Sequence, residues 1–314
     1  MNVIRDPFRP VDLPKNGVVT VGNFDGVHRG HQKMLADVVD RARELGVASV
    51  VVTFDPHPLK VLHPEIAPKM IQTLRQREEA IEACGVDTVV LVPFTRDFSL
   101  TPADEFIREL LVKRLVAREI RVGAHFVFGR GRGGNLLMLR SLGTAAGITV
   151  VGIEDVADAG RAISSTRIRD ALAAGAVAHA AALLGRPYIM DGLIARGDRM
   201  GRKIGFPTTN LQPENELYPK DGVYFTTVNI ESFDRTFPCV TNIGRRPTVY
   251  EDFATTIESY ILDFSSDVYG ERVRLAFFDR LRDEMTFPSM LDLTAQIRRD
   301  VEATRAWFVS HPLT

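Results

Sequence analysis

The 314-residue chain has few cysteines, only Cys84 and Cys239. They lie far apart and form no metal-binding spacing, so the sequence favours two free thiols in a reducing compartment. No apolar run approaches the roughly 20 residues that a membrane span requires. Met1–Lys15 contains charges and three prolines instead of an apolar segment, which is not typical of a secretory signal. We therefore expect a cytoplasmic protein without a membrane partner.

The chain also lacks an excess of either charge. Its formal net charge is -1, which argues against a broad electrostatic surface for nucleic acid. The hydrophobic content of 45% and charged content of 25% are typical of a globular protein. The length suggests about two domains. The sequence shows no internal repeat and no low-complexity tract.

The first half of the chain alternates strand-like runs with helical patterns. This alternation predicts an α/β fold, with a parallel sheet wrapped by helices. Ligands of such sheets bind at the carboxyl ends of the strands. We expect strands at 18–21, 47–54, 86–92, 120–122 and 148–153, and helices at 31–45, 74–84, 102–116 and 135–146.

The pattern changes after Ser165. Alanine-rich helical stretches at 169–174 and 177–184 end at Gly185-Arg186-Pro187, which suggests domains at 1–185 and 186–314. Short alternating runs then predict an antiparallel β-barrel or sandwich, followed by a closing helix at 289–309. The expected strands are 188–195, 222–230, 236–243, 256–264 and 273–278.

A glycine-rich segment with two histidines, Gly22–His31, follows the first of these strands and opens a helix. We call it the histidine turn. Glycines let the backbone approach a ligand, and a helix N-terminus attracts phosphate. Histidines add donors and positive charge where phosphate develops charge. The alternative is that the histidines only cap the helix or pack. The context favours a phosphate site built from Gly22, Phe24, Gly26, His28, Gly30 and His31.

Two further segments fit the same site. Ser164, Ser165 and Thr166 are typical of a helix start, and Arg167 lies in its first turn, where it can reach an oxyanion. The alternative is an ordinary cap with a solvated arginine. The glycine–arginine loop, Phe126–Asn135, is interpreted as a flexible lid over phosphates or flavin. The alternatives are an RNA-binding tract or a solvated loop.

With Thr53–Pro58, these segments resemble the nucleotidyltransferase module of bacterial bifunctional riboflavin kinase/FAD synthetases. The resemblance implies a Rossmann-like domain that transfers AMP from ATP to FMN and releases pyrophosphate. It places ATP phosphates at the histidine turn and Ser164–Arg167, with Asp55 and Pro56 as flavin contacts. One position departs: His125 stands where the family commonly has an acid or amide, which puts the details of this site in doubt.

The second half contains a glycine-rich basic segment, Gly197–Asn210. Gly201, Lys203 and Gly205 suit a flap over phosphates. If the end of the segment is extended, Thr208 and Asn210 point to the same side. Their two neutral oxygens suit Mg²⁺, which takes further ligands from substrate phosphates. The alternative is a turn followed by an ordinary strand.

Glu258 shares a strand face with Tyr260 and Leu262. Facing the barrel interior, it would be a candidate general base. From periodicity alone, a salt-bridged surface glutamate is the favoured interpretation, because most glutamates are exposed.

These second-half motifs, together with Asn242–Thr248, resemble riboflavin kinase. The resemblance implies that Thr208 and Asn210 help bind magnesium-ATP and that Glu258 activates the ribityl 5′-hydroxyl of riboflavin. Tyr260 stands where the family often has histidine. The tail around Arg282 resembles the segment that closes over flavin, which makes Arg282 a candidate flavin contact. The resemblance to both modules runs from about Gly17 to Phe308.

The resemblance implies a bifunctional enzyme that forms FMN from riboflavin and ATP, and then FAD from FMN and ATP. Mg²⁺ is the expected cofactor, no nucleic-acid partner is expected, and the oligomeric state is open. One alternative is a riboflavin kinase whose adenylyltransferase is impaired. Another is a flavin-sensing regulator without turnover, although a sensor needs no base such as Glu258. A third is an RNA-binding protein that uses the glycine–arginine loop, which the near-neutral charge disfavours.

Overall fold

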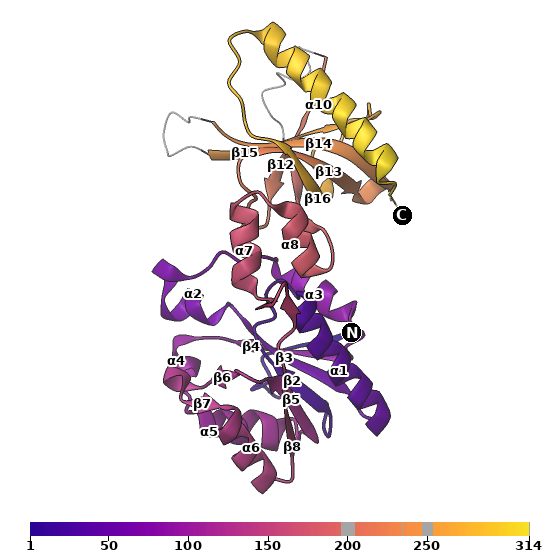
Figure 1. The fold of residues 1–314 in the computed structure, drawn as a ribbon. Helices are drawn as coiled ribbons and strands as arrows, with labels where there is room; N and C mark the ends of the chain where they lie inside the picture. Colours follow the sequence, from indigo (N-terminus) through magenta and orange to yellow (C-terminus); the bar gives the residue numbers. More distant parts are fainter. Residues whose placement is uncertain (196–204, 234, 247–253, 314) are drawn as a thin grey trace. The chain divides into compact units, whose positions relative to one another are not determined.

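The computed structural model describes residues 1–195, 205–233, 235–246 and 254–313, which form two compact units, Met1–Ser165 and Thr166–Thr314 (Figure 1). The division falls before the predicted boundary at residue 185, because helices α7 and α8 pack with the second unit. Leu172 O of α7 accepts a hydrogen bond from Lys220 N at 2.9 Å, and Gly175 lies against Arg280.

The first unit contains a six-stranded parallel sheet in the order β1-β4-β3-β2-β5-β8. The predicted parallel α/β architecture is confirmed. The edge strand β1 was not predicted, because its four residues are too few for a periodic pattern. The strands are β1 (Asn2–Arg5), β2 (Val18–Val21), β3 (Ser49–Asp55), β4 (Thr88–Pro93), β5 (Glu119–Gly123) and β8 (Thr149–Ile153).

Helices and short strands surround this sheet. The predicted helix at 102–116 forms as α5 followed by a π-helical segment, η2. The helical elements are α1 (Arg29–Leu45), α2 (Pro58–Leu62), η1 (Pro64–Ile66), α3 (Leu74–Glu82), α4 (Arg96–Ser99), α5 (Ala103–Phe106), η2 (Ile107–Arg114), η3 (Arg130–Arg132) and α6 (Leu136–Ala145). The short strands are β6 (Val127–Phe128), β7 (Gly134–Asn135), β9 (Ala157–Asp158) and β10 (Arg161–Ala162).

The fully buried strand β2 marks the point where the strand order reverses. From β2 the chain moves to β3 and β4 on one side, and it later places β5 and β8 on the other side. Open α/β sheets bind ligands outside the carboxyl ends of their strands at such a point. The histidine turn leaves the sheet from there.

The second unit is a closed barrel in the order β11-β12-β15-β14-β13-β16, which decides between the predicted barrel and sandwich. Strand β12 was not predicted. The strands are β11 (Tyr188–Ala195), β12 (Thr209–Pro213), β13 (Gly222–Ile230), β14 (Arg235–Arg246), β15 (Ala254–Ile261) and β16 (Arg272–Arg282). The helices are α7 (Ser165–Ala173), α8 (Val177–Leu184), η4 (Glu231–Phe233) and the predicted closing helix, α10 (Met290–Ser310).

Hydroxyl groups and hydrophobic side chains fill the barrel interior. The buried Thr241 lies 2.6 Å from Thr226 and 2.8 Å from Ser259, measured between hydroxyl oxygens. The alternate residues Val223 and Val240 instead pack outward against Val301 of α10. Because side chains alternate along a strand, these contacts distinguish the inner face of the barrel from the face that α10 covers.

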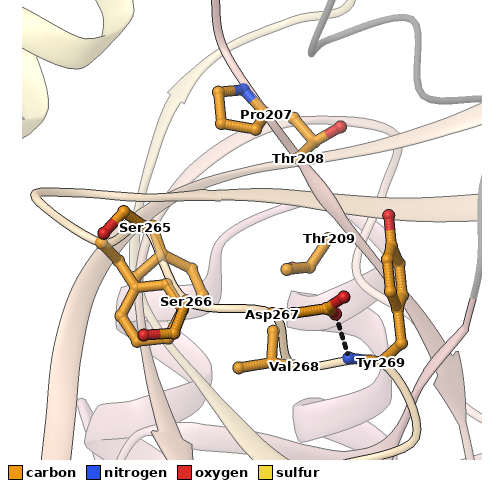
Figure 2. A pocket seen from close by; sticks show the side chains of 10 residues that line it. Pro207, Thr208, Thr209, Ser265, Ser266, Asp267, Val268 and Tyr269 are labelled. Atoms are coloured by element: carbon orange, nitrogen blue, oxygen red, sulfur yellow. Dashed lines mark hydrogen bonds between the residues drawn. The ribbon is translucent and has the colours of Figure 1, made fainter.

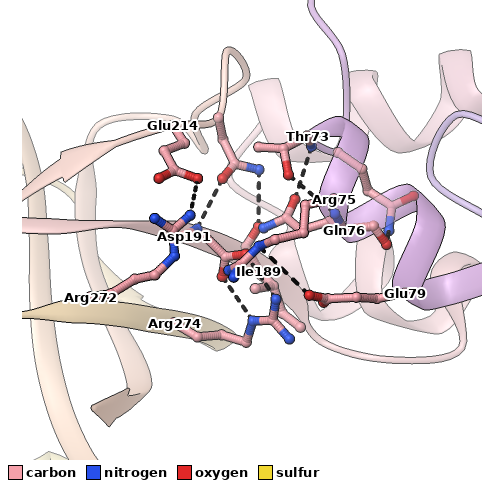
Figure 3. A network of polar contacts seen from close by, with 11 residues as sticks. Thr73, Arg75, Gln76, Glu79, Ile189, Asp191, Glu214, Arg272 and Arg274 are labelled. Carbon is pink, nitrogen blue, oxygen red and sulfur yellow. Dashed lines mark hydrogen bonds and ion pairs between the residues drawn. The ribbon is translucent and has the colours of Figure 1, made fainter. Parts of the chain in front are cut away.

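A buried ion pair ties β11 to β16 (Figure 3). The carboxylate of Asp191, fully buried, accepts two hydrogen bonds of 2.8 Å from Arg274. Asp191 N also donates to the side chain of Asn215 at 2.9 Å. Bidentate pairing of this kind satisfies a buried carboxylate that would otherwise be costly to desolvate. The pair therefore fixes the register of these two strands.

Candidate active sites

The histidine turn has an unusual backbone. Phe24, Gly26 and Val27 have φ angles of 50°, 86° and 38°. Positive φ is uncommon for phenylalanine and strained for the β-branched valine. Both side chains are buried in the core that packs under α1, and Val27 N donates to Phe24 O at 3.2 Å. Burial and this hydrogen bond hold the turn in a shape that the sequence does not favour locally.

His28 and His31 lie against each other at the start of α1. Their rings stack with centroids 3.7 Å apart, and His28 Nδ1 accepts a hydrogen bond from His31 N at 3.3 Å. His28 is therefore the N-cap, as the capping interpretation expected, but capping alone does not explain the stacked His31. A Cβ at Gly30 would lie 3.2 Å from the His28 ring, so glycine there leaves room for the ring.

His31 is uncharged at neutral pH in this environment. Burial lowers its pKa well below the ordinary value, and the neighbouring His28 lowers the pKa further. Its Nδ1 atom is buried and has no hydrogen-bond partner within the described residues. Nδ1 of His31 therefore lies buried at the turn without a hydrogen bond from the described residues. Buried polar atoms normally have a partner, so an unpartnered one is typical of a group that binds a ligand.

Asp25 joins the histidine turn to the serine segment. Its buried carboxylate accepts a hydrogen bond from Ile71 N at 3.1 Å. Its carbonyl oxygen accepts from Ser165 Oγ at 2.9 Å, at the residue where α7 begins. Thr166 and Arg167 follow in the first turn of α7, and Ser164 precedes it. The structure therefore brings Ser165 to the turn, as the motif pairing predicts.

The segment Asp55–Pro58, called the proline turn here, leaves the carboxyl end of β3 beside the histidine turn. Asp55 and Pro56 are exposed and joined by a cis peptide bond. Asn23 Nδ2 lies 3.2 Å from His57 Nε2. The candidate phosphate and flavin segments thus meet at adjacent strand ends.

Sequence analysis missed Arg77, which lies beneath both turns. Its side chain is 3% exposed and donates to Asn23 O and Phe54 O, at 3.1 and 3.0 Å. In the sequence it stands among the charged residues of α3, which is typical of a solvated helix face. No local pattern distinguishes it from those neighbours.

The glycine–arginine loop is an ordered hairpin and not the flexible segment that was expected. β6 pairs with β7, and Arg130 N donates to Thr101 O at 2.9 Å. A Cβ at Gly129 would lie 2.6 Å from Ala103, so the hairpin packs closely on α5. Arg130 and Arg132 remain exposed. A role as a lid stays a prediction.

The departing residue of the first unit, His125, is exposed. Its Nε2 atom lies 3.9 Å from Asp155 Oδ2. The contact offers His125 a carboxylate partner at the surface, and any effect of His125 on phosphates stays a prediction.

The barrel site is a row of three polar residues on three neighbouring strands. Asn210 of β12 and Asn242 of β14 each lie directly opposite Glu258 of β15. Directly paired residues point to the same face of a sheet, so these three side chains, called the polar row here, converge. Asn242 Nδ2 also lies 3.5 Å from Glu284 Oε1, which adds a second carboxylate.

The polar row lies on the outer face of the barrel, so Glu258 does not face the interior and has the surface position that periodicity alone favours. Its neighbour Ser259 points inward to Thr241, and Tyr260 packs with Val240 and with Ile297 of α10. Alternation then places Glu258 on the same side as Tyr260. The polar row therefore lies on the outer face, the face against which α10 packs, and not in the packed interior of the barrel.

A pocket of about 280 Å³ lies where the chain enters β12 (Figure 2). Thr208 and Thr209 form one wall, and Ser265, Asp267 and Tyr269 belong to the opposite loop. Asp267 Oδ1 accepts a hydrogen bond from Tyr269 N at 3.1 Å, which orders the loop. We call it the barrel pocket, and its further lining residues are Pro207, Ile261, Phe264, Ser266 and Val268.

Arg282 joins the tail to α10. Its guanidinium donates to the buried Asp300 carboxylate, with Nη2–Oδ2 at 2.6 Å and Nε–Oδ1 at 3.0 Å. In this position it anchors α10 to β16, and a flavin contact stays a prediction. Gly201 and Lys203 of the expected flap lie outside the described residues. Gly205 has a φ of 84°, and none of the described residues lies within 4 Å of the place that a Cβ would take there.

Metal binding at the barrel site depends on oxygen donors. The described residues contain no cluster of three or more histidine, cysteine, aspartate or glutamate side chains that could hold a metal. Thr208, Asn210 and Glu258 nevertheless offer oxygens, the ligand type that Mg²⁺ takes when phosphates complete its coordination. The donor set fits a metal that arrives with a nucleotide.

Together, the fold and the two sites define a two-unit transferase: a Rossmann-like nucleotidyltransferase unit and a kinase-type barrel. The family model for FAD synthetase matches residues 11–167, and the model for riboflavin kinase matches residues 184–308. The chain belongs to the bifunctional riboflavin kinase/FMN adenylyltransferase family.

Relatives of the same description match along nearly the whole chain. The bifunctional riboflavin kinase/FMN adenylyltransferase of Escherichia coli (strain K12) is 37% identical and covers 98% of each chain. That of Pseudomonas fluorescens is 40% identical and covers 92% of each chain. A crystal structure described as a macrolide-efflux protein from Streptococcus pneumoniae is 32% identical, with a TM-score of 0.89, over 98% of this chain and all of that one. Among the described residues, no helix is both long and apolar enough to span a membrane.

Proposed function

We propose that the two sites divide flavin synthesis between them. The polar row converts riboflavin and ATP to FMN and ADP, and the histidine turn converts FMN and ATP to FAD and pyrophosphate. The observation that carries this proposal is the presence of two separate polar sites, one at the switch point of the parallel sheet and one across three barrel strands. Residues 1–185 and 186–314 are the proposed functional domains, with α7 and α8 counted in the first.

In the barrel, Glu258 is the proposed general base. Its carboxylate accepts the proton of the ribityl 5′-hydroxyl while that oxygen attacks the γ-phosphorus of ATP and ADP leaves. Asn242 orients the carboxylate from the neighbouring strand. Thr208 and Asn210 would hold Mg²⁺, which neutralises charge on the phosphates when bound. The barrel pocket, beside Thr208, is the proposed site of the nucleoside of ATP, and Gly201, Lys203 and Gly205 would cover the phosphates.

At the sheet, the helix N-terminus and the histidines bind the triphosphate. A phosphate oxygen of FMN attacks the α-phosphorus of ATP, and pyrophosphate leaves. His28 and His31 stabilise charge on the phosphates, with Ser164, Ser165, Thr166 and Arg167 as further contacts. The proline turn, through Asp55 and Pro56, receives the flavin. No covalent intermediate is needed, because positioning and charge stabilisation supply the catalysis.

One assay tests the whole proposal. The purified chain is incubated with riboflavin, ATP and Mg²⁺, and the flavins are resolved by chromatography. We expect FMN to appear first and FAD to follow. FMN without FAD would indicate that the adenylyltransferase is impaired, and no new flavin would support a sensor without turnover. The proposed location is the cytoplasm, because the reactions require ATP and both cysteines are free thiols.

A further inference from the structure

Arg77 is a buried cation held between two turns that come from different strands. Nη1 donates to the carbonyl oxygen of Asn23, which belongs to the histidine turn. Nη2 donates to the carbonyl oxygen of Phe54, directly before the proline turn. Burying a charge is costly unless it is well bonded, so the fold maintains these contacts against an unfavourable desolvation.

The start of the helix that carries Arg77 is fixed as well. Helix α3 begins with a capping box in which Thr73 and Gln76 exchange hydrogen bonds between side chain and backbone (Figure 3). Burial lowers the pKa of Arg77, while the carboxylates of Asp55, Asp25 and Glu78 raise it. Arginine stays charged under such conditions. Asp55 Oδ1 lies 3.9 Å from Nη2, beyond hydrogen-bond distance, so the direct bonds go to the two carbonyls.

A guanidinium is planar, and the distance between its donors is fixed. Two carbonyls bonded to one guanidinium therefore have a fixed separation. We infer that Arg77 is a positioning residue that sets the nucleotide-binding histidine turn and the flavin-binding proline turn at the spacing that adenylyl transfer requires. This inference rests on the proposed function of the two turns.

The contrast between Arg77 and Thr53 gives a test. Thr53 Oγ1, on β3 beside Phe54, donates to the same Asn23 carbonyl at 3.2 Å. Arg77→Met removes both guanidinium links, and Thr53→Val removes the one bond from β3 to Asn23 and leaves the guanidinium bridge in place. Initial rates of FAD formation from FMN and ATP are measured for both variants, with riboflavin kinase activity of the same chain as a control.

For Arg77→Met we expect kcat to fall about a hundredfold, the size of loss that a misplacement of about 1 Å produces. We expect KM to rise for both ATP and FMN. Thr53→Val leaves the guanidinium bridge in place, so it should lower kcat a few-fold at most. Arg77→Lys keeps the charge but not the fork, so its kcat should stay near that of Arg77→Met. Kinase activity should be unchanged in all three variants.

Several results would overturn the inference: a normal kcat in Arg77→Met, an effect on one substrate only, or full activity in Arg77→Lys. Circular dichroism melts show whether each variant is folded at the assay temperature. If Arg77→Met does not fold, a folded Arg77→Lys decides alone: reduced kcat supports the inference, and wild-type kcat rejects it. His28→Ala separates the two levels. If it leaves FAD formation intact, the assignment of the turns fails, whereas unchanged activity in the Arg77 variants alone rejects only the positioning role.

Discussion

The two units assemble their sites in different ways. In the first unit, the residues of the histidine turn, proposed to bind phosphates, belong to one short segment, Gly22–His31, whose shape comes from positive φ angles and buried rings. In the barrel, the polar row comes from three strands, and strand register alone brings Asn210, Asn242 and Glu258 together. A local motif makes the first site, and long-range pairing makes the second.

The difference has consequences for the effects of mutation. A change in the histidine turn alters the backbone and the chemistry at once, because His28 is both a cap and a ligand candidate. In the polar row each side chain is replaceable without moving the others, because the ladder of backbone hydrogen bonds holds the strands. The variants below test this contrast, beginning with the largest expected effect.

Glu258→Gln should lower FMN formation about a thousandfold, because the amide cannot accept the hydroxyl proton. Adenylylation of added FMN should continue at the wild-type rate. Separate assays with riboflavin and with FMN measure the two steps. The matched control is Glu302→Gln, which changes an exposed glutamate of α10. Equal loss in both assays would contradict the division of labour between the units.

His28→Asn should lower FAD formation about a hundredfold and spare FMN formation. Asparagine is a good N-cap, so this variant removes the imidazole and keeps a capping side chain. His28→Ala removes the imidazole and also the capping side chain. It should abolish FAD formation and lower the stability of the chain by a further ~1 kcal/mol. If His28→Asn keeps full activity while His28→Ala loses it, the histidine acts only as a cap.

Asn210→Ala should raise the Mg²⁺ concentration for half-maximal FMN formation about tenfold, as expected when a metal site loses an oxygen contact. The rate at saturating Mg²⁺ should change less, because the strand pairing keeps Glu258 in place. Asn229→Ala, near the end of a different strand, β13, is the control. If the rate instead falls at every Mg²⁺ concentration and the half-maximal concentration stays the same, Asn210 does not act in metal binding.

His31 should make the stability of the first unit depend on pH. Folding lowers the pKa of His31, so the unfolded chain binds the proton more tightly. Its contribution is complete above the ordinary pKa of about 6.5 and falls as the pH drops below it, by at most about 1.4 kcal/mol per pH unit. Thermal melts between pH 7 and 5 should show this slope, and His31→Asn should reduce it. His63→Asn, at an exposed site, should not.

Sequence reasoning predicted the two architectures because hydrophobic periodicity and turn residues are local properties. It also identified the histidine turn and Ser165, which the structure brings together through Asp25. It favoured a surface position for Glu258 because most glutamates are exposed, whereas alternation along one strand does not itself say which face is inside. Arg77 was missed since its burial depends on the packing of α3 beneath two turns, which has no local signal.

The outer position of the polar row separates the chemistry of the barrel from its packing. Interior residues such as Cys239, Ile257 and Ile261 are buried and lie away from the face that carries Glu258. Volume-conserving exchanges among them alter stability by modest amounts. Because such exchanges leave the face that carries Glu258 unchanged, the stability of the barrel and its proposed chemistry can be altered through different residues of the same strands.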